Sequence, residues 1–131
     1  MDNMFIESKS KFNLEETVLK LTEAVSKSEW KLIHTHDLQQ LMHKNELKVL
    51  PAKVMEICAP SFAFKLLSSD EERVYSNMMP CRLSVYEKAN GETYVSRMNI
   101  EQFASQMGGV VQEVMQIAFR GAEGFINQVV E

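Results

Sequence analysis

The stretch that decides the fold runs from residue 54 to residue 98. It begins with VMEICAP (54–60), continues through SFAFKLL (61–67) and MPCR (79–82), and ends in a hairpin around Asn90-Gly91. Residues 54–58 have the apolar character of a core strand, and Pro60 suits the first turn of a helix, where its missing N–H costs nothing. Residues 82–87 and 93–98 predict two paired strands, because Asn-Gly supplies the positive φ angles that a tight hairpin requires.

The flanking sequence adds two strands and several helices. Residues 5–12 predict an edge strand, and residues 30–35 alternate so that Trp30, Leu32 and His34 share one side. Helices are predicted over residues 14–28, 38–45, 60–67, 100–107 and 110–130, the first of them capped by Asn13. The fold class that follows is α+β, with a single-layer, mainly antiparallel sheet of about four to five strands, covering helices and a long C-terminal helix.

The predicted C-terminal helix carries an apolar stripe wider than one packed face needs. A small domain cannot bury such a helix on more than one side, so we expect a homodimer. Gly121 and Gly124 would each weaken the helix by about 1 kcal/mol relative to Ala, so we expect them to serve close packing.

Length and composition describe a single domain over residues 1–131, with 45% hydrophobic and 24% charged residues. The formal net charge of −4 and the absence of Lys/Arg runs argue against a nucleic-acid partner. The N-terminus lacks the basic and then apolar pattern of a secretory signal, and no apolar run approaches the roughly 20 residues of a membrane helix. We therefore expect a cytoplasmic protein without a membrane partner, whose two cysteines are free thiols.

Several short motifs together resemble a known family. They are CAP (58–60) with Ala63 and LL (66–67), then MPCR (79–82) and VYE (85–87). The chain resembles, over nearly its whole length, the small bacterial and archaeal domains grouped as domain of unknown function 302 (DUF302). The resemblance implies a compact α+β domain with a helix-covered antiparallel sheet, reported in dimers, and it implies no activity. Ala59 stands where many members carry Asn, so no role of that amide transfers to this chain.

The two cysteines form the first candidate site. Cys58 ends one strand at the start of a helix, where the helix dipole would favour a thiolate, and Cys81 begins another strand. Pro60 and Pro80 flank the pair, and Arg82 could stabilise an anion there, although strand alternation points it to the opposite face. The functional interpretation is a redox pair, a thiol nucleophile or a soft-metal site. The alternative is two small core residues, since free Cys is among the most buried residue types.

Two further sets of side chains are candidate metal ligands. His34 and His36 form a His-x-His pair that could share a metal ion. Zinc requires one or two further ligands, for which Asp37 and Cys58 are the candidates. Met78-Met79 lie beside Cys81 and suggest a thioether-thiolate site for copper(I). The alternatives are exposed polar histidines at a strand-to-helix corner and methionines that fill the core.

The sequence offers no cofactor motif and favours binding over catalysis. It contains no Gly-rich phosphate loop, no Gly-x-Ser-x-Gly elbow and no Cys-x-x-Cys. The first functional hypothesis is therefore a homodimeric module that binds a small ligand or a protein partner. The second is a thiol-dependent redox or electrophile-handling protein that uses Cys58 and Cys81.

Overall fold

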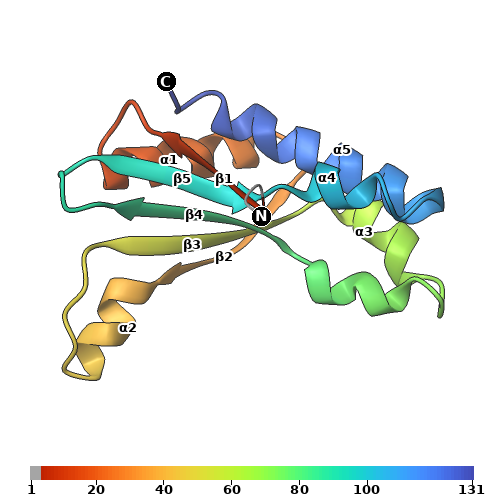
Figure 1. Ribbon diagram of the computed structural model, residues 1–131, viewed down its shortest axis with the longest axis horizontal. Helices are drawn as coiled ribbons and strands as arrows, with labels where there is room; N and C mark the ends of the chain where they lie inside the picture. The colour runs from red at the N-terminus through yellow and green to blue at the C-terminus, as the bar shows by residue number, and fades with distance from the viewer. Residues whose placement is uncertain (1–3) are drawn as a thin grey trace.

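A five-stranded antiparallel sheet forms the centre of the computed structural model, which describes residues 4–131 (Figure 1). The strands lie in the order β1-β5-β4-β3-β2, so β1 and β2 are the two edges, as the sequence predicts for the first strand. Their bounds are β1 Phe5–Lys9, β2 Lys31–Asp37, β3 Ala52–Cys58, β4 Cys81–Glu87 and β5 Thr93–Met98. The predicted α+β class is confirmed.

Five α-helices and one 3₁₀ helix connect and cover the strands. They are α1 Leu14–Ser26, α2 Leu38–Lys44, α3 Pro60–Leu67, the 3₁₀ helix η1 Arg73–Met78, α4 Ile100–Ala104 and α5 Gly109–Ile126. The predicted cap is present: Asn13 Oδ1 accepts the backbone N–H of Glu16 at 2.8 Å. Within residues 4–131, no helix combines the length and the hydropathy that a bilayer crossing requires.

The β4–β5 hairpin has the predicted register, with Val85 opposite Val95. Its turn differs from the prediction, because Gly91 alone adopts a positive φ, of 84°, whereas Asn90 does not. The N–H of Gly91 donates to the carbonyl of Lys88, and that of Lys88 donates to the carbonyl of Glu92. The loop between Lys88 and Glu92 therefore has three residues, 89–91, one more than a two-residue hairpin. Only its last position, Gly91, needs glycine.

Strand β2 contains a bulge that the sequence alternation did not reveal. Leu32 pairs with Ile57 on the core face, but the register shifts before His34, which pairs with Glu56. The prediction that Leu32 and His34 share a face is therefore wrong. A bulge places an extra residue in one strand, so side chains after it point the other way. As a result, His34 and His36 both lie on the face opposite the core.

The buried side chains form two clusters joined by α5. The first lies between the sheet, α1 and α5 and consists of Leu14, Leu21, Val25, Met55, Ile57, Leu83, Val85, Val95, Ala122, Phe125, Ile126 and Val129. The second lies between α3, α4 and the first half of α5 and consists of Leu66, Ala104, Val111, Val114 and Met115. The central line of the α5 stripe, Phe125 included, is therefore buried within one chain. Val110, Ile117, Ala118 and Phe119 stay partly exposed, so the stripe by itself is no evidence for a dimer.

The two glycines of α5 have different surroundings. A Cβ on Gly121 would lie 2.7 Å from Cζ2 of Trp30, whose ring packs edge-on against Phe125 with 5.6 Å between centroids. A Cβ on Gly124 would meet nothing within 4 Å. Close packing therefore explains Gly121, and the same expectation for Gly124 is wrong.

A buried ion pair ties α5 to the sheet. Arg97 of β5 is only 8% exposed on the core face, and its guanidinium binds Glu123 through two contacts, Nε–Oε2 at 2.6 Å and Nη2–Oε1 at 2.8 Å. Arg97 also donates to the Ser8 hydroxyl at 2.9 Å and to the Val95 carbonyl at 3.3 Å. The ion pair and the hydrogen bonds offset the free-energy cost of burying the charged guanidinium of Arg97.

Candidate functional site: a pocket lined by both cysteines

The two cysteines line one small pocket, where the end of β3 and the start of β4 meet α3 and α5. Pro80 and Ala59 also line it, and the cavity has a volume of about 40 Å³. Ile57 pairs with Cys81 in the sheet, so Cys58 follows directly after the strand pairing that holds Cys81. The remaining lining side chains are apolar.

Both cysteines are free thiols of intermediate exposure. Burial raises the pKa of Cys58. Burial, and then the charge of Cys58, raise the pKa of Cys81 to about 11. The sequence suggested the opposite direction for Cys58, from its position before α3. The apolar surroundings disfavour the thiolate and raise the pKa.

The two other residues proposed with the cysteines lie outside this pocket. Pro60 occupies the first position of α3 and shapes the turn without lining the cavity. The Arg82 side chain is 70% exposed, and its Nε lies 3.6 Å from Oε2 of Glu56. Glu56 also lies 3.1 Å, Oε1 to Nε2, from His36. Arg82 therefore belongs to a charged group on the other face of the sheet and not to the thiols.

The predicted histidine pair is present but lacks further ligands. The rings of His34 and His36 pack edge-to-face with 4.4 Å between centroids. Among residues 4–131, no group of three or more His, Cys, Asp and Glu side chains has an arrangement that could hold a metal ion. Cys58 therefore does not complete a metal site with the histidines.

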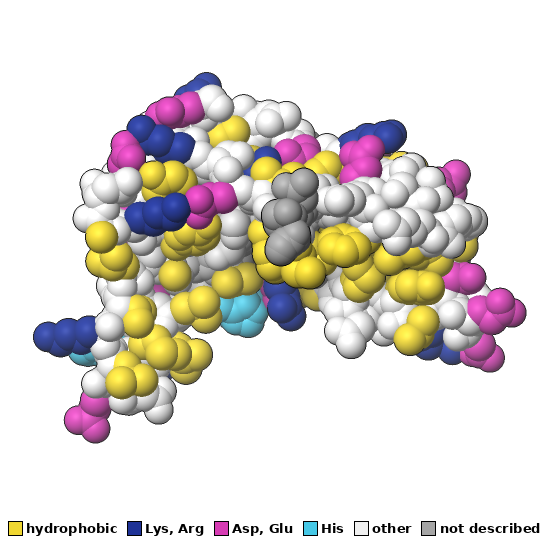
Figure 2. Space-filling model, viewed as in Figure 1, with side chains coloured by type: hydrophobic (Ala, Val, Ile, Leu, Met, Phe, Trp, Pro, Cys, Tyr) yellow, Lys and Arg dark blue, Asp and Glu magenta, His cyan; other side chains and the backbone are white. Residues whose placement is uncertain are grey.

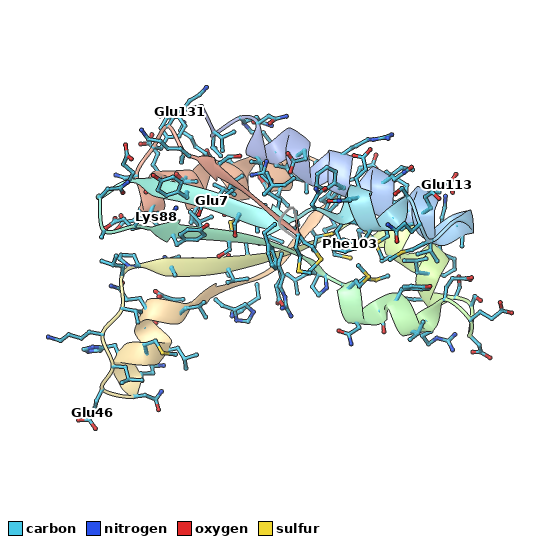
Figure 3. The ribbon with its side chains drawn as sticks, in the orientation of Figure 1. Glu7, Glu46, Lys88, Phe103, Glu113 and Glu131 are labelled. Atoms are coloured by element: carbon cyan, nitrogen blue, oxygen red, sulfur yellow. The ribbon has the colours of Figure 1, made fainter. Side chains whose placement is uncertain are left out.

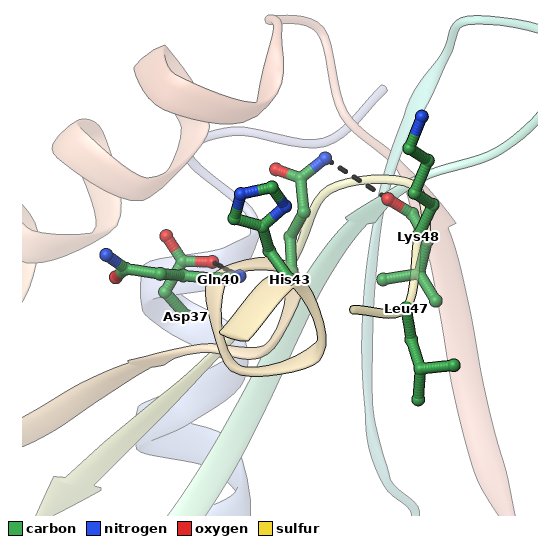
Figure 4. A pocket seen from close by; sticks show the side chains of 7 residues that line it. Asp37, Gln40, His43, Leu47 and Lys48 are labelled. Carbon is green, nitrogen blue, oxygen red and sulfur yellow. Dashed lines mark hydrogen bonds between the residues drawn. The ribbon is translucent and has the colours of Figure 1, made fainter. Parts of the chain in front are cut away.

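A larger hollow lies between α2 and the loop that follows it (Figure 4). It has a volume of about 570 Å³ and is bordered by Asp37, Gln40, His43 and Lys48 among others. Its polar groups bind their own backbone: Asp37 Oδ1 accepts the N–H of Gln40 at 3.0 Å, and the Gln39 side chain donates to the Val49 carbonyl at 3.1 Å. These bonds stabilise the α2 segment, and we assign the hollow no chemistry.

The sheet face opposite α1 and α5 carries polar and aromatic side chains that stay partly exposed. At one end of this open face, Lys88 Nζ lies 2.8 Å from Oε1 of Glu7 (Figure 3), and Tyr86 donates to the same carboxylate. Tyr86 stacks on Tyr94 with 6.4 Å between centroids. Figure 2 shows histidine and basic side chains above a hollow between two lobes of the surface, the α2 segment and the α3–η1 segment.

Sequence reasoning missed the contribution of α5 to the thiol pocket. Met115 and Ala118 of α5 line it, together with Trp30, which directly precedes β2. No local motif connects these positions to the cysteines, because only the packing of α5 across α3 brings them together. The adjacent Met78 and Met79 also line the pocket, in agreement with their position next to Cys81.

The fold and the pocket define a small α+β protein with a five-stranded antiparallel sheet and two free thiols at one end of it. The model of the family described as "Domain of unknown function DUF302" matches residues 6–128. The chain therefore belongs to the DUF302 family, as its motifs indicate.

One solved structure with the same fold is the crystal structure of an uncharacterized conserved DUF302 protein from Bacillus stearothermophilus. It superposes with a TM-score of 0.83 at 17% sequence identity, over 95% of this chain and 97% of that chain. At this identity the similarity establishes the fold alone. A comparison with curated proteins found no match.

Proposed function

We propose that the chain is a cytoplasmic, single-domain homodimeric module that binds a small ligand or a protein partner. A second copy of the chain covers the open face of the sheet. The observation that carries this proposal is the exposed apolar pair at the β1 edge of that face. Phe5 is 61% exposed and Met98 is 39% exposed, and the two residues are directly paired between β1 and β5.

Two further features of the open face support a self-complementary contact. The stacked Tyr86 and Tyr94 present amphipathic rings of the kind enriched in interfaces. The face also carries both signs of charge, because Arg82 and Glu56 lie in its middle and Lys88 and Glu7 at its end. A two-fold axis brings each patch onto the same patch of the partner, so a face with both signs can match itself.

Native mass spectrometry of protein purified without reductant or chelator tests this proposal. We expect a dimer for the wild type and a folded monomer for the variant Phe5→Glu/Met98→Glu, since burying two carboxylates in the interface is unfavourable. The matched control is Leu19→Glu on α1, which is 57% exposed and lies on a helix that packs against the opposite face of the sheet, so it should remain dimeric. Extra mass on the dimer would give the ligand class.

Two outcomes would contradict the interface. If the wild type stays monomeric at high micromolar concentration, the chain does not form the proposed homodimer. If the Phe5→Glu/Met98→Glu variant forms a dimer as stable as that of the wild type, the dimer contact lies elsewhere on the surface. Phe125→Glu is not informative about assembly, because Phe125 is buried in the first core cluster and the substitution should unfold the chain.

The second candidate function is a thiol-dependent redox or electrophile reaction at Cys58 and Cys81. The observation in its favour is that both thiols line the same pocket. The raised pKa values of both groups count against a nucleophile, which needs a thiolate near neutral pH. Alkylation kinetics of the folded protein test this function. A thiol that reacts faster when folded than when unfolded would support it, and slow labelling of both would exclude it.

A further inference from the structure

The segment of residues 38–50, which we call the arm, consists of α2 and most of the loop that leads to β3. None of its residues is buried. In Figure 1 the arm projects from one end of the sheet, beside β2 and β3. Four aliphatic side chains of the arm are between 46% and 55% exposed: Leu41, Leu47, Val49 and Leu50. So many large apolar side chains in one short exposed segment indicate a contact surface.

Polar bonds within the arm hold its conformation without apolar burial. The Asp37 side chain caps α2, and the Gln39 side chain donates to the carbonyl of Val49 at 3.1 Å. The Asn45 side chain donates to the carbonyl of Leu41 at 2.9 Å. The arm therefore presents its aliphatic side chains in a defined arrangement, and a partner that binds there has to order little additional chain.

A second exposed apolar surface lies at the opposite end of the sheet, on α3, η1 and the loop between them. We call these residues, 60–78, the lobe. Three large apolar side chains of the lobe are exposed: Phe64 by 69%, Leu67 by 42% and Val74 by 71%. The arm and the lobe project on the same side of the sheet and flank the hollow of its open face (Figures 1 and 2). A second copy that covers the open face therefore meets both surfaces.

The charges of the arm and the lobe are of opposite sign. In the arm, Lys44 and Lys48 outnumber Glu46, and all three are exposed. In the lobe, the three consecutive acidic residues 70–72 outnumber the two basic residues. Contact between two arms would bring lysines together, and contact between two lobes would bring carboxylates together, which is unfavourable in both cases. Contact of an arm with a lobe brings opposite charges together.

We propose that the homodimer forms by reciprocal contact, in which the arm of each copy packs against the lobe of the other. A two-fold axis across the open face that exchanges its two ends produces this contact twice, as an isologous interface requires. The aliphatic side chains of the arm then cover the exposed apolar side chains of the lobe. This inference rests on the proposed homodimer and specifies which segments hold it together.

Charge reversal on either surface tests the contact. The arm variant is Lys44→Glu/Lys48→Glu, and the lobe variant is Glu71→Lys/Glu72→Lys. Each should raise the dimer dissociation constant by at least about tenfold in analytical ultracentrifugation at low ionic strength, because arm and lobe then carry like charge. The quadruple variant, with both reversals in one chain, should dimerise within about threefold of the wild type. An equimolar mixture of the arm and lobe variants should form heterodimers, since each arm then meets a lobe of opposite charge.

Two further variants separate the contact from general effects of charge. Lys11→Glu/Lys27→Glu is the matched control, because it reverses two exposed lysines just before and just after α1, which packs on the other face of the sheet. It changes the net charge as the arm variant does and should dimerise like the wild type. Leu47→Ser/Leu50→Ser keeps the charge of the arm and should weaken the dimer by at least about tenfold, because it removes apolar area from the contact. Every substituted side chain in these two variants is exposed, so both chains should keep the wild-type circular dichroism spectrum.

The outcomes distinguish failure of this contact from failure of the homodimer. If the wild type is monomeric, both proposals are wrong. If the wild type is dimeric and neither the arm nor the lobe variant weakens it, the homodimer stands and the contact between arm and lobe is wrong. The contact is also wrong if neither the quadruple variant nor the mixture restores dimers, or if the α1 control weakens them equally.

Discussion

The two glycines of α5 allow one packing contact to be measured with an internal reference. Gly121 and Gly124 lie one turn apart in the same helix, so replacing either by Ala should give the same gain in helix propensity, about 1 kcal/mol. Only at Gly121 does the new methyl group meet a neighbour, at 2.7 Å from Cζ2 of Trp30. Carbon atoms prefer separations of about 3.5–4.0 Å, so the indole or the helix must move by roughly 1 Å.

The indole has little freedom to move, because its ring is rigid and packs edge-on against Phe125. Overpacking of this kind costs about 1–3 kcal/mol. We therefore expect Gly124→Ala to be more stable than the wild type by up to about 1 kcal/mol. Gly121→Ala should be less stable than Gly124→Ala by about 1–3 kcal/mol, which is the steric cost alone.

Urea unfolding monitored by far-UV circular dichroism gives the three free energies of unfolding. Repeating Gly121→Ala in a Trp30→Phe background closes a double-mutant cycle, since the smaller ring removes the atom that the methyl group meets. The penalty should disappear in that background. Equal stability of Gly121→Ala and Gly124→Ala, or a penalty that survives Trp30→Phe, would refute the packing argument.

Three other predictions concern buried charge and shifted pKa values. Glu123→Ala should cost about 3–5 kcal/mol in urea unfolding because it leaves Arg97 buried without its partner, and Arg97→Met/Glu123→Leu should recover most of that loss. In a Cys58→Ser variant, Cys81 should alkylate more slowly at pH 8 when folded than in urea, because burial alone still raises its pKa; equal rates would contradict its burial. Burial and then the hydrogen bond to Glu7 raise the pKa of Tyr86 to about 12, so its contribution to stability is complete below pH 10 and is lost as the pH rises through about 12. Ultraviolet titration should show one of the three tyrosines ionising last, and Glu7→Gln should bring it closer to the others.

The strands and helices were predictable because their signals are local. The caps at Asn13 and Asp37, the proline at the start of α3 and the hairpin at Gly91 each define an end or a turn by contacts within a few residues. The bulge after Leu32 was not predictable, since it depends on pairing with β3 and leaves the alternation of the sequence intact. Because of this bulge, His34 lies on the open face with His36 and not on the core face with Leu32.

The other features that the sequence did not predict depend on contacts between residues far apart in the chain. The ion pair of Arg97 with Glu123 joins residues 26 positions apart. Strand alternation places Arg97 on the same face as Val95, but no local signal identifies Glu123 as its partner. The wide stripe of α5 was correctly described from the sequence. One helix packs against two clusters in succession along the same face, and Val110, Ile117 and Phe119, which widen the stripe, stay partly exposed. A stripe of this width therefore indicates a dimer only after the contacts within one chain have been assigned.

The candidate pocket lies where the two apolar clusters meet. Trp30 and Cys81 pack against the first cluster, and Phe62, Met78 and Met79 pack against the second. Small voids arise where two cores join, so the cavity alone does not require a function, and methionine is well suited to filling such irregular space. A residue that only fills space tolerates replacement by Leu, so Met78→Leu/Met79→Leu should change the free energy of unfolding by less than about 1.5 kcal/mol if these side chains only fill the void between the two clusters.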